Sequence, residues 1–209
     1  IERIRLSSIE PKIITQKFAN RLVKLEKICH QFHLSLQSGC DETLNRMNRR
    51  YTTEEFLEVT RILRNSYEDV ILTTDIIVGF PGETDEEFEK TYNYLKEIKF
   101  YKMHVFKYSP RKGTKAAVME NQINGNIKEE RSRKLIELSN KNQEEYNKKY
   151  IGRKVEVLFE ESEEKYYKGH TPNYILVKVE TDDNLENEIR KVIITEAYEE
   201  HVKGRVCTV

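Results

Sequence analysis

The stretch from residue 70 to residue 98 constrains the fold of this chain more than any other part. Val70 to Val78 is an apolar, β-branched run, which suits a strand buried on both faces. Gly79-Phe80-Pro81-Gly82 interrupts it, because glycine permits backbone angles that other residues avoid and proline fixes a turn. Thr84 and Glu87 then form a capping box that begins a helix. Strand, turn and capped helix make half of a βαβ unit, and ligands bind over such turns.

Strands and helices alternate before residue 115. The predicted strands are 2–9, 32–36, 70–78 and 103–107, and the predicted helices are 15–28, 41–47, 52–63 and 84–98. This alternation predicts an α/β fold with a parallel sheet that helices cover. Because a complete eight-unit barrel needs about 250 residues, we expect a partial (β/α) barrel or an open sheet.

The pattern changes in the second half of the chain. A loop at 115–126 leads to a long charged helix at 127–149, which Asn126 and Glu129 are expected to cap. Gly152 marks a boundary, after which apolar residues alternate with a period of two in five short segments. The sequence therefore predicts two domains, residues 1–149 and 150–209, of which the second is a small antiparallel β-barrel.

Charge is balanced over the 209 residues but unevenly distributed. Residues 99–154 contain 15 basic and 6 acidic side chains, whereas residues 155–209 contain 7 and 13. The basic segment would attract a polyanion, or it is a solvated helix face. No apolar run approaches the roughly 18 residues of a membrane span, so we expect a cytoplasmic protein without a membrane partner. Because the chain begins at Ile1 within a predicted strand, we also expect a fragment of a longer protein.

The three cysteines predict no metal site. Cys29, Cys40 and Cys207 are odd in number and far apart, and no pair has the spacing of a zinc or iron–sulfur motif. We expect ordinary packing or surface residues in a reducing compartment.

Several segments together resemble the motifs of one family, the radical SAM methylthiotransferases. They follow one another in order at residues 5–11, 33–39, 45–51, 75–84 and 108–114. The last 60 residues, from Tyr150, resemble the OB-like TRAM barrel that binds RNA at the end of those enzymes. Residues 37–44 and 169–175 look most like the branch that acts on threonylcarbamoyladenosine in tRNA. The branches acting on isopentenyladenosine in tRNA and on ribosomal protein S12 are the nearest competitors.

The resemblance implies a reaction. S-adenosylmethionine would be cleaved reductively at a [4Fe-4S] cluster, and sulfur and a methyl group would be attached to an adenosine beside the anticodon of tRNA. The cysteine loop and the N-terminal domain that hold clusters in the family are missing from this sequence. We therefore expect this chain alone to bind no cluster and to have no catalytic residue or activity. Neither the electron donor nor the sulfur source is indicated, and the competing hypothesis is a non-catalytic RNA-binding module.

The resemblance also implies a cofactor site at the carboxyl ends of the strands. The residues expected to bind S-adenosylmethionine are Ser8, Glu10, Gln37, Ser38, Ile77, Gly79, Phe80, Pro81, Phe106 and Tyr108. The turn at 79–81 would lie under the adenine, although ordinary turn chemistry is the alternative for each polar residue here. Glu83 is expected to be an anion at a helix N-terminus rather than a catalyst. His33 is expected to be a packed core histidine.

A second set of residues is expected to bind tRNA. The expected phosphate contacts are Arg46, Arg49, Arg50, Arg111 and Lys112. In the barrel, Tyr166 and Tyr174 would stack on bases while Lys168 meets the backbone. Ordinary surface charge and barrel packing are the alternatives.

Overall fold

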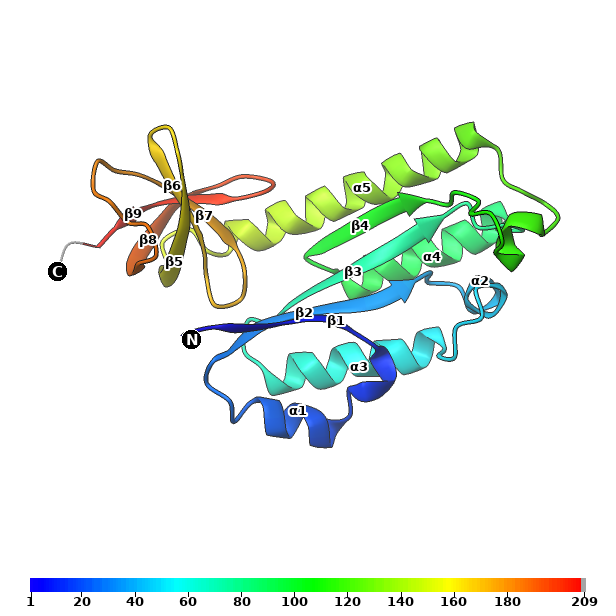
Figure 1. Ribbon diagram of the computed structural model, residues 1–209, viewed down its shortest axis with the longest axis horizontal. Helices are drawn as coiled ribbons and strands as arrows, with labels where there is room; N and C mark the ends of the chain where they lie inside the picture. The colour runs from blue at the N-terminus through cyan, green and yellow to red at the C-terminus, as the bar shows by residue number, and fades with distance from the viewer. Residues whose placement is uncertain (208–209) are drawn as a thin grey trace.

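The computed structural model describes residues 1–207, which form a parallel sheet with covering helices and a separate closed barrel (Figure 1). The sheet has the order β1-β2-β3-β4, and all three pairings are parallel as predicted. Its strands are β1 (Ile4–Ile9), β2 (Ile28–Gln37), β3 (Ile71–Val78) and β4 (Lys102–Lys107). The helical elements between them are η1 (Pro11–Ile13), α1 (Gln16–Leu22), α2 (Asp41–Arg46), α3 (Thr53–Ser66) and α4 (Asp85–Ile98).

One face of the sheet packs against the helices and forms the main core. Phe32 and Leu34 of β2 and Ile76 of β3 are fully buried there, together with Phe56 of α3 and Leu95 of α4. Both α3 and α4 begin at the predicted capping boxes, in which the threonine accepts from the glutamate amide and the glutamate carboxylate accepts from the threonine amide. Local capping and the apolar stripe thus agree on where these helices lie.

The first helix is shorter than its periodicity predicts. Thr15 caps α1 as expected, but the helix ends at Leu22. Ile28, predicted to be helical, begins β2 and pairs with Ile4 of β1. Because apolar residues spaced by three or four also occur across a helix, a loop and a strand, the pattern alone did not locate the end of the helix.

The long helix α5 (Gly125–Lys148) runs beside β4 and adds Leu135 and Leu138 to the main core (Figure 1). Its cap is Asn124, whose side chain accepts from the amide of Asn126, so the predicted cap at Asn126 was wrong by two residues. A short helical turn, η2 (Lys115–Val118), lies in the preceding segment. Within residues 1–207, no helix is both long and apolar enough to cross a bilayer.

The second domain is a closed barrel with the order β5-β6-β7-β9-β8. Its strands are β5 (Lys154–Glu163), β6 (Tyr166–His170), β7 (Leu176–Glu180), β8 (Ile189–Ala197) and β9 (Val202–Val206). The prediction of an entirely antiparallel barrel was wrong at one pairing, because β7 and β9 are parallel. After pairing antiparallel with β8, β9 lies beside β7, and this contact closes the barrel and removes its free edges.

The barrel docks at the amino ends of the sheet strands. The carbonyl of Asp69, just before β3, accepts from Tyr146 Oη at 3.1 Å and from Asn173 Nδ2 at 2.9 Å. The Asp69 carboxylate also pairs with Arg153 at 2.7 Å. In Figure 1 the arrowheads of the sheet strands point away from the barrel. The carboxyl ends of the strands, where the cofactor residues were predicted, therefore lie at the other end of the sheet.

Candidate functional site

The face of the sheet that the helices leave uncovered is polar. Alternate residues of β2 and β3 point to it, including Gln31, His33, Thr73 and Asp75. Gln31 Nε2 donates to Thr73 Oγ1 at 2.9 Å, and His33 Nδ1 lies 3.0 Å from the same hydroxyl. Gln31 and Thr73 are buried, so this satisfied network orders the face of the sheet opposite the apolar core.

A cavity of about 640 Å³ lies at the carboxyl ends of β3 and β4. It brings together several residues that the sequence predicted for the cofactor or for RNA, namely Gln37, Ile77, Phe106, Tyr108 and Arg111. The sequence reasoning missed the other residues that line it, which are Asp75, Lys107, Ser109, Thr114 and Ala116. Asp75 could have been found from its position two residues before Ile77, because alternate strand residues share a face.

The chemistry of this cavity fits an adenosine-like ligand such as S-adenosylmethionine. Ile77 and the half-exposed ring of Phe106 supply apolar surface for a planar base, while Gln37 supplies an amide. Tyr108 also lines the cavity, and its buried hydroxyl has no hydrogen-bond partner among the described residues. Largely apolar walls with a few polar groups are typical of small-molecule sites.

Residues 79–81, the turn that follows β3, do not line the cavity. The φ of Gly79 is +70°, and a Cβ there would lie 2.4 Å from Cγ of Lys128. Phe80 is buried and packs edge-on against Tyr108, with ring centroids 5.2 Å apart. Pro81 is buried as well. The turn thus supports the Tyr108 wall, and direct contact of residues 79–81 with the cofactor stays a prediction.

Glu83 precedes α4 as predicted, and its side chain is buried. Its Oε1 accepts from the amide of Gly79 at 2.9 Å and from Nη1 of Arg131 at 2.6 Å. Burial raises the pKa of Glu83, whereas the Gly79 amide and Arg131 act in the opposite direction. Its role is therefore to hold the turn against α5.

Besides residues 79–81, three further predicted cofactor residues lie outside the cavity, namely Ser8, Glu10 and Ser38. Ser8 and Glu10 are exposed around the end of β1, and Ser8 has a φ of 45°. Ser38 is buried, with its hydroxyl 3.3 Å from Thr91 Oγ1 and accepting from the amide of Cys40. Their contacts with the cofactor remain predictions.

The uncovered face also holds a cluster that the sequence reasoning did not recognise. His33 Nε2 lies 3.2 Å from Oδ2 of Asp75, and His104 of β4 lies beside them. His33 is only partly buried and lies on this polar face. The prediction that it packs in the apolar core was therefore wrong. The neighbours of His33 on the adjacent strands, Thr73 and His104, lie about 40 and 70 positions away in the sequence. A local sequence pattern does not reveal such contacts.

Of the RNA contacts predicted in the first domain, four side chains are exposed and one is held in an ion pair. Arg49, Arg50, Arg111 and Lys112 are exposed near the carboxyl ends of the strands. Arg46 instead forms a two-armed ion pair with Glu87, and this carboxylate raises the pKa of the guanidinium. A phosphate would have to compete with Glu87 for Arg46.

The predicted RNA contacts of the barrel lie on two different surfaces. Tyr174 is at the contact with the sheet, where its ring stacks on His170 at 4.1 Å and lies under Arg5 at 3.6 Å. Both faces of this ring are therefore covered by protein. Tyr166 lies near Lys203, and Lys168 pairs with Glu163.

The barrel carries a row of three lysines that the sequence did not reveal. Lys168, Lys178 and Lys203 occupy directly paired positions on β6, β7 and β9, so their side chains point to one face. Lys203 Nζ lies 5.1 Å from the ring centroid of Tyr166 and 5.2 Å from that of Tyr198. We call these three residues the lysine row. The lysine row depends on the parallel β7–β9 pairing, which the sequence did not predict. The net acidic composition of the barrel gave no sign of it either.

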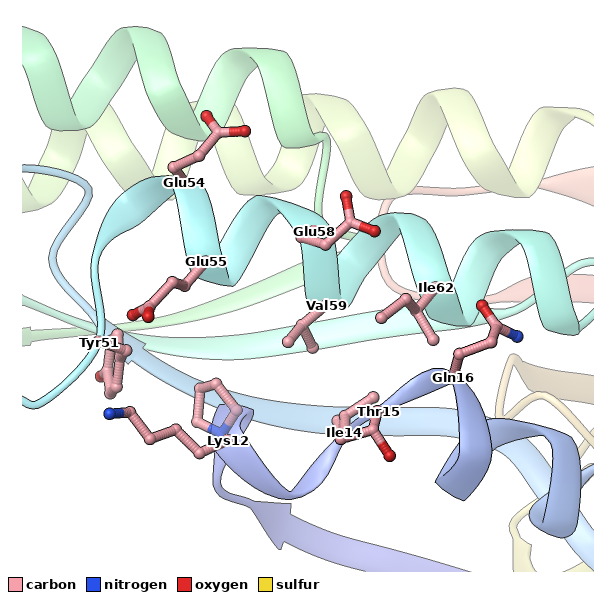
Figure 2. A pocket seen from close by; sticks show the side chains of 11 residues that line it. Lys12, Ile14, Thr15, Gln16, Tyr51, Glu54, Glu55, Glu58, Val59 and Ile62 are labelled. Carbon is pink, nitrogen blue, oxygen red and sulfur yellow. The ribbon is translucent and has the colours of Figure 1, made fainter.

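A further cavity, of about 680 Å³, lies among the helices between α1 and α3 (Figure 2). Glu54, Glu55 and Glu58 of α3 line one side of it, and Lys12 and Gln16 lie opposite. An acidic wall disfavours a polyanion. This cavity holds none of the predicted cofactor or RNA residues.

The cysteines do not fit an iron–sulfur cluster. Cys29 and Cys40 are buried in separate places, and Cys207 follows the last barrel strand. Cys40 Sγ donates to Glu42 at 2.9 Å. Burial raises the pKa of both buried thiols, which opposes the thiolate that a cluster requires.

Comparisons with known proteins agree with this geometry. Residues 1–95 match the family model of the Radical SAM superfamily. The chain is 42% identical to the threonylcarbamoyladenosine tRNA methylthiotransferase MtaB of Bacillus subtilis, over 94% of this chain and 45% of the relative. It is 37% identical to tRNA-2-methylthio-N(6)-dimethylallyladenosine synthase of Alkaliphilus oremlandii, over 99% of this chain and 44% of the relative.

Two solved structures share the fold. Coproporphyrinogen III oxidase HemN of Escherichia coli has a TM-score of 0.56 at 19% identity, covering 67% of this chain and 32% of that one. Elp3 of the archaeon Methanocaldococcus infernus has a TM-score of 0.50 at 18% identity, covering 66% and 32%.

The chain spans less than half the length of the curated relatives it matches. Its sheet and helices nevertheless reproduce part of a radical SAM barrel, and a small barrel follows them. The chain therefore belongs to the radical SAM methylthiotransferase family, whose cofactors are S-adenosylmethionine and a [4Fe-4S] cluster.

Proposed function

We propose that the chain is part of a tRNA-modifying enzyme of the cytoplasm that converts N6-threonylcarbamoyladenosine beside the anticodon into its 2-methylthio derivative. The observation that carries this proposal is the cavity at the carboxyl ends of β3 and β4, in a chain of this family. The higher identity to the threonylcarbamoyladenosine enzyme, 42% against 37%, favours this substrate over dimethylallyladenosine.

Within the cavity, Ile77 and Phe106 hold the planar base of S-adenosylmethionine by apolar contact, and Gln37 hydrogen-bonds to its polar edge. The cofactor, with its cluster, supplies the radical that activates an unreactive carbon–hydrogen bond. The described residues offer no ligand set for the cluster. Their contribution is therefore to bind and orient the cofactor and the substrate.

The tRNA is proposed to contact both ends of the sheet. Arg49, Arg50, Arg111 and Lys112 lie near the cavity, whereas the lysine row lies on the barrel at the opposite end. An eight-residue strand such as β3 extends about 26 Å. A folded RNA is long enough to span this separation, and neutralising its phosphates at two places positions the modified nucleotide without reading a sequence.

The test is nucleoside mass spectrometry of tRNA from cells that lack the encoding gene. We expect 2-methylthio-N6-threonylcarbamoyladenosine to disappear and its unmodified precursor to accumulate. The gene restored with Phe106→Ala should recover little of the product, whereas the control Val118→Ala, at a side chain that is 86% exposed, should recover all of it.

If methylthio-dimethylallyladenosine disappears instead, the substrate is dimethylallyladenosine and not threonylcarbamoyladenosine. An unchanged content of both products would leave a non-catalytic RNA-binding role and overturn the proposal.

A further inference from the structure

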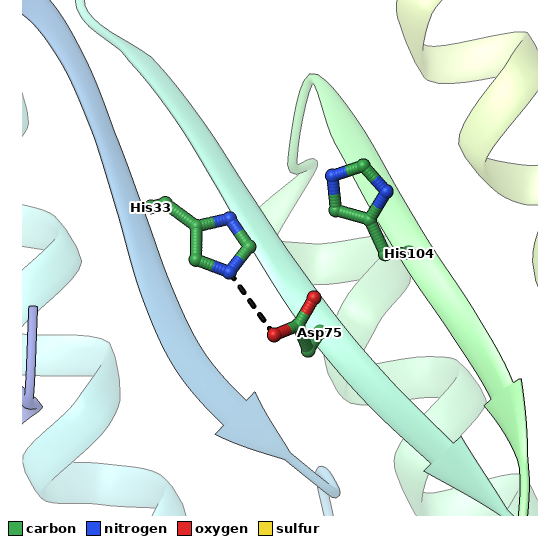
Figure 3. A group of neighbouring side chains, drawn as sticks. All are labelled: His33, Asp75 and His104. Carbon is green, nitrogen blue, oxygen red and sulfur yellow. Dashed lines mark ion pairs between the residues drawn. The ribbon is translucent and has the colours of Figure 1, made fainter. Parts of the chain in front are cut away.

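Three neighbouring strands bring two imidazoles and one carboxylate together on the uncovered face of the sheet (Figure 3). His33 lies on β2, Asp75 on β3 and His104 on β4, and Asp75 is directly paired with His104. One possible ligand atom from each residue lies within 4.8 Å of the other two. The two imidazole centroids are 5.7 Å apart, and Asp75 Oδ2 is 3.2 Å from His33 Nε2.

A chain of hydrogen bonds fixes the orientation of His33. Its Nδ1 lies 3.0 Å from Thr73 Oγ1, which also accepts from Gln31 Nε2 at 2.9 Å. The Gln31 carbonyl in turn accepts from Arg5 Nε at 2.8 Å. When Nδ1 donates to the threonine hydroxyl, Nε2 presents a lone pair toward Asp75. A second hydrogen bond to the remote nitrogen is the usual way in which proteins position a histidine ligand.

The cluster has room to accept a ligand. His104 is exposed and Asp75 only partly buried, and Asp75 also lines the 640 Å³ cavity. Arg5 is held by Gln31 and Tyr174, so its charge does not occupy the space between the two histidines.

We propose that His33, Asp75 and His104 bind a divalent transition-metal ion, with one coordination position left open toward the cavity. Nitrogen and carboxylate oxygen bind Zn²⁺ at about 2.0–2.2 Å, and three protein ligands with a free fourth position are typical of open zinc sites. The same ligand set also suits Fe²⁺. The donors approach to bonding distance by rotation of the exposed His104 side chain. This site is independent of the proposed substrate.

The experiment is calorimetric titration of the 209-residue chain with Zn²⁺, in a Cys207→Ser background that removes the partly exposed thiol. We expect one ion per chain, and the same stoichiometry from the visible absorption of Co²⁺. His104→Ala and Asp75→Asn should each weaken Zn²⁺ binding at least tenfold. His201→Ala, which removes a histidine of the barrel, is the matched control and should leave the affinity unchanged.

Thr73→Val tests the orientation of His33. Loss of this second contact should weaken Zn²⁺ binding by 10-fold to 100-fold while circular dichroism remains that of the parent chain. Absence of Zn²⁺ binding by the parent chain would overturn the proposal. Equal affinities of the parent, His104→Ala and Asp75→Asn chains would do so as well, because the ion would then lie elsewhere.

Discussion

Nη1 of Arg131 lies 2.6 Å from Oε1 of Glu83, with only 5% and 4% of the two side chains exposed. The same guanidinium reaches the exposed carboxylate of Asp85 at 2.7 Å through Nη2. Because Glu83 Oε1 also accepts from the Gly79 amide, the pair joins α5 to the turn that follows β3. Phe80 of this turn packs against Tyr108, and so the turn also supports the wall of the cavity. A buried charge pair thus maintains the wall of the candidate site.

Arg131→Met should destabilise the first domain by about 3–5 kcal/mol, because the carboxylate of Glu83 would remain buried without its partner. The measurement is the free energy of unfolding in urea. Arg133→Met on the same helix is the control, since Arg133 is exposed and its contact with Glu137 is 4.0 Å long. That change should cost less than about 0.5 kcal/mol. Equal stabilities of the two variants would contradict this account.

The elements that local chemistry specifies could be predicted from the sequence. Thr52 with Glu55 and Thr84 with Glu87 placed the starts of α3 and α4, because a capping box satisfies amides within four residues. The parallel sheet followed from alternation of strands and helices. Gln37, Ile77, Phe106 and Tyr108 were predicted for one site, and the structure brings them to one cavity.

What the sequence did not reveal depends on contacts between distant residues. The partner of Glu83 is 48 positions away, and that of His33 is on the next strand of the sheet. The lysine row exists only because β9 lies beside β7. Strand alternation assigns residues to two faces, but it does not say which face the helices leave uncovered.

Asn173→Ala should loosen the contact between the barrel and the sheet. Asn173 Nδ2 donates to the Asp69 carbonyl and to Tyr150 Oη at 2.6 Å, so its loss leaves the hydroxyl of the buried Tyr150 without this partner and the carbonyl with one fewer donor. We expect a cost of about 1–3 kcal/mol. Hydrogen exchange should show faster exchange at residues 150–153, with the strands of both domains still protected. The control Asn184→Ala lies in an exposed barrel loop, and matching exchange in both variants would contradict the prediction.

Lys178→Ala should weaken the binding of tRNA and reduce the dependence of log K on log[salt] by about one unit, because one phosphate contact and its released counterion are lost. Lys178 is the central member of the lysine row. Fluorescence anisotropy at several salt concentrations measures both quantities. Lys191→Ala on β8 is the control, since Lys191 is exposed and lies outside the lysine row, opposite Glu156 of β5 in the strand register. An unchanged salt slope for Lys178→Ala would place the RNA elsewhere on the barrel.

His201 should make the stability of the barrel depend on pH. Burial, together with Lys178 and Lys203, lowers the pKa of His201 below its ordinary value of 6.5. The unfolded chain therefore takes up a proton first as the pH falls, so stability is present above about pH 6.5 and is lost below it. His104, whose pKa is also lowered, acts in the same direction in the first domain.

His201→Gln should therefore reduce, but not abolish, the difference in the free energy of unfolding between about pH 7.5 and about pH 5.5, because glutamine does not titrate in this range. Urea unfolding at the two pH values, followed by a signal from the barrel, measures this difference. His30→Gln is the control, because His30 lies against Tyr67 in the first domain. If His201→Gln keeps the full pH dependence, the destabilisation at low pH does not originate at His201, and the prediction is wrong.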